Sequence, residues 1–88
     1  MVLLEGVPNA VTQGVVAATS IPVIGIGAGP HAHGQILVMH DMLGVTAGRK
    51  PRFVKNYMAE AGGVEAAFAS YVGEVKSGAY PQPTHGFG

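Results

Sequence analysis

The sequence contains no cysteine and few charged residues, and each shortage excludes a class of protein. Without cysteine, the 88-residue chain has no disulfide framework and no thiolate chemistry. Only 11% of its residues are charged, where about a quarter is usual, and five basic side chains balance five acidic ones. A balanced chain lacks the basic surface that holds a phosphate backbone, so we expect no nucleic-acid partner.

Long apolar runs and targeting signals are also missing. No stretch approaches the ~20 apolar residues that cross a bilayer, and the N-terminus has no basic start or small-residue cleavage site. We therefore expect a cytoplasmic protein without a membrane partner. Since 48% of residues are hydrophobic, the chain is too apolar for disorder. A domain this small buries only about 60–65% of its unfolded surface, so we expect some apolar surface to meet another chain or a missing part of the same one.

Three short apolar runs predict the strands of a parallel sheet, at about residues 1–5, 21–26 and 35–39. Between the first two, residues 8–9 open a helix of about ten residues that reaches Thr19, with Asn9 as its N-cap. A strand, a helix and a strand in so short a stretch form a βαβ unit, which makes the strands parallel. Because the first strand begins at residue 1 without a turn before it, we expect a truncated domain.

The second half of the chain predicts two further helices. Pro51 stands at a favoured first helical position, and this helix would end at the glycines at 62 and 63. The next would run from about Val64 to Lys76 with Gly78 as its C-cap, and the tail from Tyr80 should be irregular. Its apolar residues recur at helical spacing: Val64, Phe68, Tyr71, Val72 and Val75. Three strands and three helices, compatible with alternating order, define an α/β chain.

Glu5 and the glycine-rich stretch 25–29 end neighbouring predicted strands. The carboxyl ends of parallel strands share an edge of the sheet, and α/β enzymes build their sites there. Glu5 is thus a candidate general base, although a carboxylate at a strand end is often solvated or in a salt bridge. Gly27 and Gly29 are candidates for close approach to a ligand, with tight packing of the strands as the alternative.

Three polar clusters have both a functional and a structural interpretation. His31 and His33 have the spacing of two metal ligands on an extended backbone, as in metal-dependent hydrolases, but a solvated loop pair is the more common case. His40 and Asp41 would orient a ligand or, as we favour, cap a turn. The basic residues would steer an anionic substrate or cofactor, or belong to a solvated helix start: Arg49, Lys50, Arg52 and Lys55.

Four motifs, in order along the chain, resemble the ketopantoate hydroxymethyltransferase family. They are residues 3–8 (Leu-Leu-Glu-Gly-Val-Pro), 21–29 (Ile-Pro-Val-Ile-Gly-Ile-Gly-Ala-Gly), 34–41 (Gly-Gln-Ile-Leu-Val-Met-His-Asp) and 51–55 (Pro-Arg-Phe-Val-Lys). The tail is similar as well, through Glu74 and Val75, Gly78, Tyr80 and Pro81, and the His-Gly-Phe at 85–87. The resemblance covers essentially the whole chain.

This resemblance implies a fold and a reaction. Members of the family are (β/α)₈ barrels, commonly decamers, that transfer a one-carbon unit from 5,10-methylenetetrahydrofolate to 2-oxoisovalerate with the help of Mg²⁺. The product, ketopantoate, leads to pantothenate. Glu5 matches the base that removes the proton beside the keto group. Residues 1–88 would supply the last three strands of the barrel and no metal ligand, since the family's metal-binding residues lie on earlier strands.

The chain also departs from the family's pattern. His33 stands where a carboxylate is usual, and Thr84 and Gly86 alter the usual ending. These departures would change how the loop contacts its surroundings, whereas Glu5 and the glycine loop match the family. Because the earlier strands are missing, we expect the isolated chain to be inactive unless another chain supplies them, and we assign neither Mg²⁺ nor the folate co-substrate to this segment alone. Two alternatives stay open: a non-catalytic, self-associating barrel fragment, and a metal-dependent, hydrolase-like half-barrel that uses His31 and His33.

Overall fold

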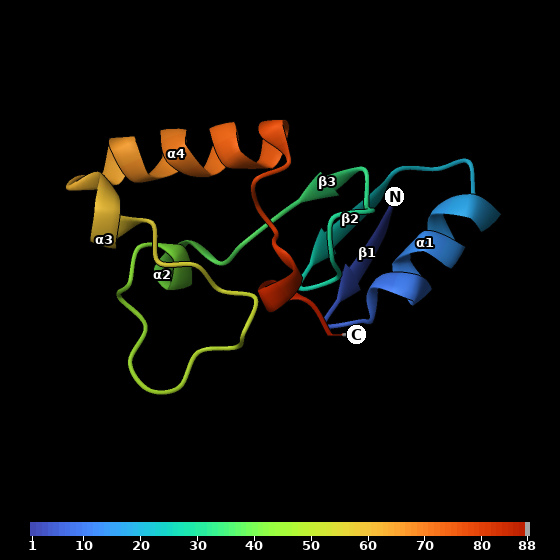
Figure 1. Ribbon diagram of the computed structural model, residues 1–88, viewed down its shortest axis with the longest axis horizontal. Coiled ribbons are helices and arrows are strands. Elements are labelled where there is room, and N and C mark those ends of the chain that lie inside the picture. The colour runs from blue at the N-terminus through green and yellow to red at the C-terminus, as the bar shows by residue number, and fades with distance from the viewer. Residues whose placement is uncertain (88) are drawn as a thin grey trace.

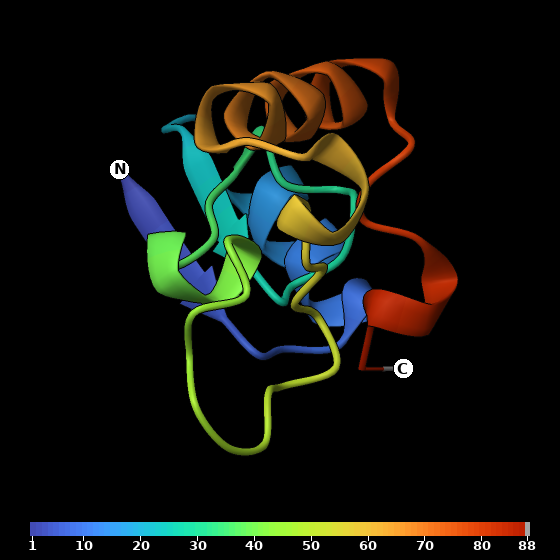
Figure 2. The ribbon, with the colours of Figure 1, turned by 90° about the vertical axis from the view of Figure 1, so that its left-hand side faces the viewer.

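The computed structural model describes residues 1–87 and divides them between a sheet and a helical part (Figure 1). The sheet part contains β1 (Val2–Glu5), α1 (Asn9–Ala18), β2 (Val23–Ile26) and β3 (Gly34–Gln35). The helical part contains α2 (Met39–Met42), α3 (Met58–Ala61) and α4 (Val64–Ser77), and the tail holds a single 3₁₀ turn, η1 (Pro83–His85). Seen along the long axis, α4 and the loop that joins α2 to α3 lie on opposite sides of the molecule (Figure 2).

The three strands are parallel, in the order β1-β2-β3. Val2 of β1 is in register with Val23, and Glu5 with Ile26. β3 joins the other edge of β2, with Ile24 opposite Gly34. The predicted parallel strands and the βαβ unit are therefore confirmed. The result is an α/β fragment with three parallel strands, consistent with part of the barrel of a larger protein.

The third strand is much shorter than predicted. Residues 35–39 were expected in the sheet, but β3 ends at Gln35 and Met39 begins α2. After Ile36 donates its N–H to the carbonyl of Gly25, 2.9 Å away, the chain leaves the sheet. It leaves because β2 ends at Ile26 and Gly27, at φ 65°, turns the neighbouring chain away. Val38 and Met39 consequently stay half-exposed instead of forming a buried strand.

The helix expected from Pro51 to residue 62 is reduced to the single turn of α3. A helix would need the Tyr57 N–H to bond to the Phe53 carbonyl, four residues earlier. Instead, the Tyr57 N–H donates to the carbonyl of Met42 at 2.8 Å, and the Tyr80 hydroxyl donates to the carbonyl of Phe53. Long-range partners thus take both groups that would have closed the helical turn.

The last helix agrees with its prediction. α4 begins at Val64 and ends at Ser77, and Gly78 follows in the left-handed conformation that a C-cap requires. Part of the predicted apolar stripe packs inward, because Phe68 and Tyr71 contact a buried cluster of Met42, Tyr57 and Ala67. Val64 and Val72, in contrast, remain about half-exposed.

The first helix has the predicted length but a different start and a different buried face. Pro8, not Asn9, is the N-cap, and no side chain caps the helix. Thr12 is fully buried, whereas Val11 is half-exposed. Thr12 is buried because its hydroxyl donates to the carbonyl of Ala28, 2.6 Å away, which ties the helix to the end of β2. Within residues 1–87, no helix has the length and apolar character needed to cross a membrane.

Candidate functional site

Glu5 and the glycine turn meet at one edge of the sheet, as predicted. Glu5 is the last residue of β1 and the register partner of Ile26, which ends β2. The N–H of Gly6 donates to the carbonyl of Ile26 at 2.9 Å, so the ends of the two strands stay joined. Gly27 comes directly after Ile26 in the chain. The edge where strands β1 and β2 end therefore presents one carboxylate beside one glycine turn, and we call this edge the Glu5 rim.

The carboxylate of Glu5 lies on the open face of the sheet. Burial alternates along β1, with Leu3 and Glu5 exposed and Val2 and Leu4 partly buried. Side chains of a strand alternate between the two faces, so Leu3 and Glu5 share the uncovered face. Among residues 1–87, no group bonds to the Glu5 carboxylate or pairs with it. The side chain is therefore available to a molecule that occupies this face.

The glycines of the turn are buried by side chains that the sequence did not identify. Gly27 has φ 65°, and a Cβ built on it would lie 2.3 Å from the ring of Phe53. Gly29 has φ 80°, and its Cβ would lie 2.1 Å from Oδ1 of Asn9. Both positions therefore require glycine, for conformation and for space. Both glycines pack against side chains of other elements, and their approach to a ligand stays a prediction.

Of the two histidines at 31 and 33, only His33 has hydrogen bonds that hold it in the fold of residues 1–87. Nδ1 of His33 accepts the N–H of Val23 at 2.9 Å, and the His33 N–H donates to the carbonyl of Val23 at 2.8 Å. These two hydrogen bonds, one through the backbone of His33 and one through its ring, align the loop with β2. His31 is exposed. In the described part of the chain, no three His, Asp or Glu side chains gather closely enough to hold a metal ion.

His40 and Asp41 stabilise the turn that follows α2. The hydroxyl of Thr46 donates to the carboxylate of Asp41, and the N–H of Val45 donates to the carbonyl of His40 at 2.9 Å. The pair lies in a helix instead of at a strand end. Its observed contacts correspond to the capping role that the sequence favoured.

The four basic residues at positions 49–55 differ in their partners. Lys55 pairs with Glu74 of α4, at 2.9 Å from Nζ to Oε1. Arg52 donates to the carbonyl of Gly86 at 3.1 Å, and its guanidinium lies over the ring of Phe87. Arg49 and Lys50 make no ion pair within residues 1–87.

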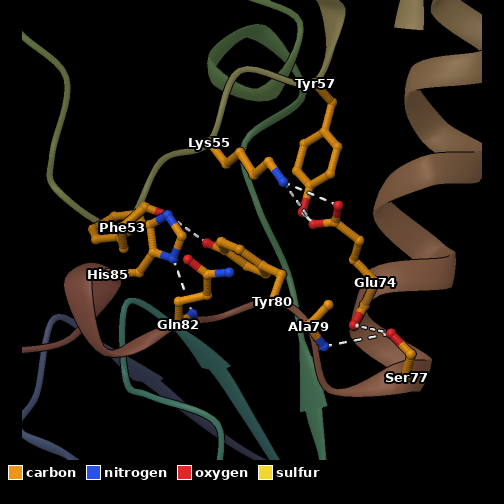
Figure 3. Close-up of polar contacts among 9 residues, drawn as sticks. All are labelled: Phe53, Lys55, Tyr57, Glu74, Ser77, Ala79, Tyr80, Gln82 and His85. Carbon is orange, nitrogen blue, oxygen red and sulfur yellow. Dashed lines mark hydrogen bonds and ion pairs between the residues drawn. The ribbon is translucent and has the colours of Figure 1, made fainter. Parts of the chain in front are cut away.

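A polar network around Glu74 holds α4 to the rest of the chain (Figure 3). Nζ of Lys55 contacts both carboxylate oxygens, at 2.9 and 3.0 Å, and the hydroxyl of Tyr57 donates to Oε1 at 2.8 Å. The hydrogen bond from Lys55 is the main cause that lowers the pKa of Glu74, and that of Tyr57 adds to it. Burial, and then the hydrogen bond to Glu74, raise the pKa of Tyr57. The network thus favours a charged carboxylate and a neutral phenol.

Tyr57, a member of this network, packs against two further tyrosines, and a histidine lies next to them. The rings of Tyr57, Tyr71 and Tyr80 meet edge to face, with centroids 5.6 to 6.2 Å apart. The ring of His85 lies 4.9 Å from that of Tyr80, and its Nδ1 accepts the N–H of Gln82 at 3.0 Å. Burial is the main cause that lowers the pKa of His85. No local signal in the sequence identifies Tyr57 as part of this network, because its partners lie in α4 and in the tail.

The network predicts that acid destabilises the chain in two steps. A pKa lowered by folding means that the unfolded chain binds more protons, so stability falls as the pH drops through that window. For His85 the fall begins near the unperturbed pKa of 6.5, and for Glu74 it begins near 4.5. The free energy of unfolding in urea, measured from pH 8 to pH 3, should show both steps.

Two substitutions assign the steps. His85→Asn keeps an acceptor for the Gln82 N–H but does not titrate, and it should remove the step near neutrality. Glu74→Gln should remove the acidic step and cost about 1 kcal/mol at pH 7 through the lost ion pair. Identical pH profiles for Glu74→Gln and the unchanged chain would show that the pair with Lys55 does not stabilise the fold.

Comparison with known proteins agrees with the motifs described above. A family model described as ketopantoate hydroxymethyltransferase matches residues 1–83. The chain belongs to this family. The resemblance recognised in the sequence is therefore confirmed.

The relatives show how much of a family member is present. The 3-methyl-2-oxobutanoate hydroxymethyltransferase of Cronobacter sakazakii is 55% identical over 87 residues, which are 99% of this chain and 33% of the relative. A protein named 3-methyl-2-oxobutanoate hydroxymethyltransferase 2, from Hahella chejuensis, is 52% identical over the same shares. A probable enzyme of that name from Schizosaccharomyces pombe is 47% identical, again over 99% and 33%. The chain thus spans about a third of the length of its relatives.

Proposed function

We propose that Glu5 is the general base of a hydroxymethyltransferase that converts 2-oxoisovalerate to ketopantoate, a step toward pantothenate. The position of Glu5 supports this proposal most directly: it ends β1, beside β2, with its carboxylate on an open face and no partner among residues 1–87. The names of the relatives, together with identities near 50%, support the same reaction. Enzymes of α/β folds place their catalytic groups at this end of the strands.

The reaction assigns one proton transfer to Glu5. Its carboxylate would take the proton from the carbon next to the keto group, leaving an enolate. The enolate would attack the one-carbon unit of 5,10-methylenetetrahydrofolate, and uptake of one water molecule would give the hydroxymethyl group and tetrahydrofolate. A base for such a proton must lie within hydrogen-bond reach of the substrate, and a carboxylate on an unobstructed face meets that requirement.

We further propose that residues 1–88 form the C-terminal segment of a (β/α)₈ barrel. Three parallel strands do not close a barrel, which needs about eight. The relatives are about three times as long as the matched segment. The other strands would then come from the rest of a longer protein or from another chain, and the keto acid would bind where the two parts meet.

Mg²⁺, which the family implies, does not fit the residues described here. A magnesium site uses carboxylates and substrate oxygens, and residues 1–87 offer no cluster of three candidate ligands. Glu5 lies apart from the other acidic residues along the chain and is assigned to proton transfer instead. The metal ligands would therefore belong to the other strands of the barrel.

Complementation tests the proposed function. The chain would be mixed with the part of the Cronobacter sakazakii relative that it does not match, and ketopantoate would be measured with 2-oxoisovalerate, 5,10-methylenetetrahydrofolate and Mg²⁺. We expect product only when both parts are present. Product from the isolated chain, freed of host enzyme, would disprove the need for other strands. A stable complex of the two parts that makes no ketopantoate would disprove the function.

The open face also supports a second role, as a non-catalytic fragment that associates with itself. Leu3 is 55% exposed on the face that carries Glu5, and the outer edge of β1 has no partner strand among residues 1–87. Exposed edges of this kind pair readily with other chains. Sedimentation at rising concentration separates the two roles: a monomer at high concentration would count against self-association.

A further inference from the structure

The loop between α2 and α3, residues 43–57, concentrates the positive charge of the chain. It contains four of the five lysine and arginine residues and no acidic residue. These residues are Arg49, Lys50, Arg52 and Lys55. Figures 1 and 2 show the loop as a long excursion away from the other elements. We call residues 43–57 the basic loop.

Only one of the four charges is paired within the described chain. Lys55 lies against both carboxylate oxygens of Glu74. Arg52 uses one guanidinium nitrogen for the carbonyl of Gly86, a neutral partner, and its other N–H groups are left for another acceptor. Arg49 is exposed and Lys50 partly buried, and residues 1–87 give neither of them an ion pair. Three cations within four positions are thus uncompensated.

The base of the basic loop is held closed by backbone and side-chain contacts. The Tyr57 N–H donates to the carbonyl of Met42 at 2.8 Å, which joins the two ends of the loop. Gly44, near the start, packs so closely on Asn56 that a Cβ at Gly44 would lie 2.5 Å from Nδ2 of Asn56. Compact surface loops with joined ends are frequently functional. The charges at 49, 50 and 52 therefore extend from a fixed base.

Phe53 connects the basic loop to the Glu5 rim. Its ring packs on Gly27, the residue after Ile26, and Ile26 is the register partner of Glu5. The Tyr80 hydroxyl fixes the same residue through its carbonyl (Figure 3). Arg52, next to Phe53 in the chain, is therefore held at the margin of the rim where the one-carbon chemistry is proposed.

We propose that Arg49, Lys50 and Arg52 bind the glutamyl carboxylates of the folate co-substrate. The inference rests on the proposed function and names the part of that site that holds the donor's tail. A folate carries its one-carbon unit at the pterin end and two or more carboxylates at the glutamyl end. The keto acid has a single carboxylate, which must stay beside the reacting carbon at Glu5. Three cations on one loop, of which Arg52 is next to the rim and the others are further along the loop, suit the polyanion better than the keto acid.

A binding experiment on the 88-residue chain tests the inference without catalysis. Calorimetry at low salt would measure binding of p-aminobenzoyl-tri-γ-glutamate, which is the folate tail without the pterin. The double variant Arg49→Gln/Lys50→Gln should bind about two- to thirtyfold more weakly, because it loses two exposed ion pairs. The control is Lys76→Gln, an exposed lysine in the last turn of α4, which should change binding less than twofold. Circular dichroism would verify that each variant is folded, and the single variant Arg49→Gln would replace the double variant if it is not.

Competition distinguishes tail recognition from a general attraction of anions. At matched ionic strength, sulfate and 2-oxoisovalerate should displace p-aminobenzoyl-tri-γ-glutamate much less effectively than free tri-γ-glutamate does. Equal displacement by sulfate would overturn the inference, and so would equal weakening by Lys76→Gln and the double variant, or the absence of binding.

Failure of this inference is distinguishable from failure of the proposed function. In the complemented protein, Arg49→Gln/Lys50→Gln should raise KM for tri-glutamylated methylenetetrahydrofolate by a similar factor and leave KM for 2-oxoisovalerate unchanged. Unchanged KM values with normal ketopantoate formation would overturn only the role of the basic loop. Intact binding of the folate tail without ketopantoate formation would overturn only the proposed reaction.

Discussion

Replacing Glu5 by glutamine is expected to lower the rate of ketopantoate formation in the complemented protein by about 100- to 10,000-fold, the usual contribution of a general base. The amide cannot accept the proton from the keto acid, whereas its size and shape match the carboxylate. Glu5 is exposed and unpaired within residues 1–87, so the free energy of unfolding should change little. The rate is measured as product formed at saturating keto acid and folate.

Two comparisons make this prediction specific. Glu65→Gln removes another exposed carboxylate, in the first turn of α4, and should leave the rate within a factor of two. Glu5→Asp keeps the base but draws it back by one methylene, and it should retain more activity than Glu5→Gln. If Glu5→Gln kept half or more of the activity, the general base would have to be another residue.

Replacing Gly27 by alanine should destabilise the chain by about 2–5 kcal/mol. Gly27 has φ 65°, a conformation that costs an alanine about 1–2 kcal/mol. The new methyl group would also lie 2.3 Å from Cδ2 of Phe53, and overpacking of this kind costs about 1–3 kcal/mol. Because a domain of this size is stable by only a few to about 13 kcal/mol, the loss should be plain in urea unfolding.

Gly14 provides the matched control for this prediction. It lies in α1, and a Cβ built there meets no atom within 4 Å. Gly14→Ala should therefore stabilise the chain by up to about 1 kcal/mol through helix propensity. Adding Phe53→Leu to Gly27→Ala should recover part of the steric cost but none of the conformational cost. Equal stability of Gly27→Ala and the unchanged chain would mean that Phe53 does not pack on this turn.

The sequence predicts what adjacent residues determine. The runs that became β1 and β2 carry their own apolar pattern, and the helix between them fixes their relative direction, so the rim with Glu5 and Gly27 could be predicted. The span of α4 was equally accessible, since its apolar spacing and Gly78 are local signals. Its position at the end of a predicted strand also singled out Glu5 as a candidate site residue, and its role as a general base stays a proposal.

The errors fall where distant groups compete with local preference. The segment after Pro51 has helical potential, but Met42 and Tyr80 take the backbone groups that a helix would use. The third apolar run lost its partner because β2 ends at Ile26. No pattern within either segment reports these events, because the competing residues are up to 27 positions away.

The same limit applies to the packing around the glycine turn. Asn9 was expected to cap a helix, yet its side chain fills the space beside Gly29 and Gly86. Thr12 has a polar side chain, so the sequence does not indicate that it is buried. In the structure its hydroxyl donates a hydrogen bond to the carbonyl of Ala28. A glycine indicates that space is scarce at its position, but it does not identify the residue that occupies the space.

The contact between Gly27 and Phe53 has a consequence for recombination within the family. One partner belongs to the sheet and the other to the segment that leads to the C-terminus, so any crossover between them can bring together residues from different parents. A chimera would tolerate such a junction only if both parents have glycine at position 27 and an aromatic ring of similar size at position 53. Recombination between these enzymes should therefore exchange positions 27 and 53 together.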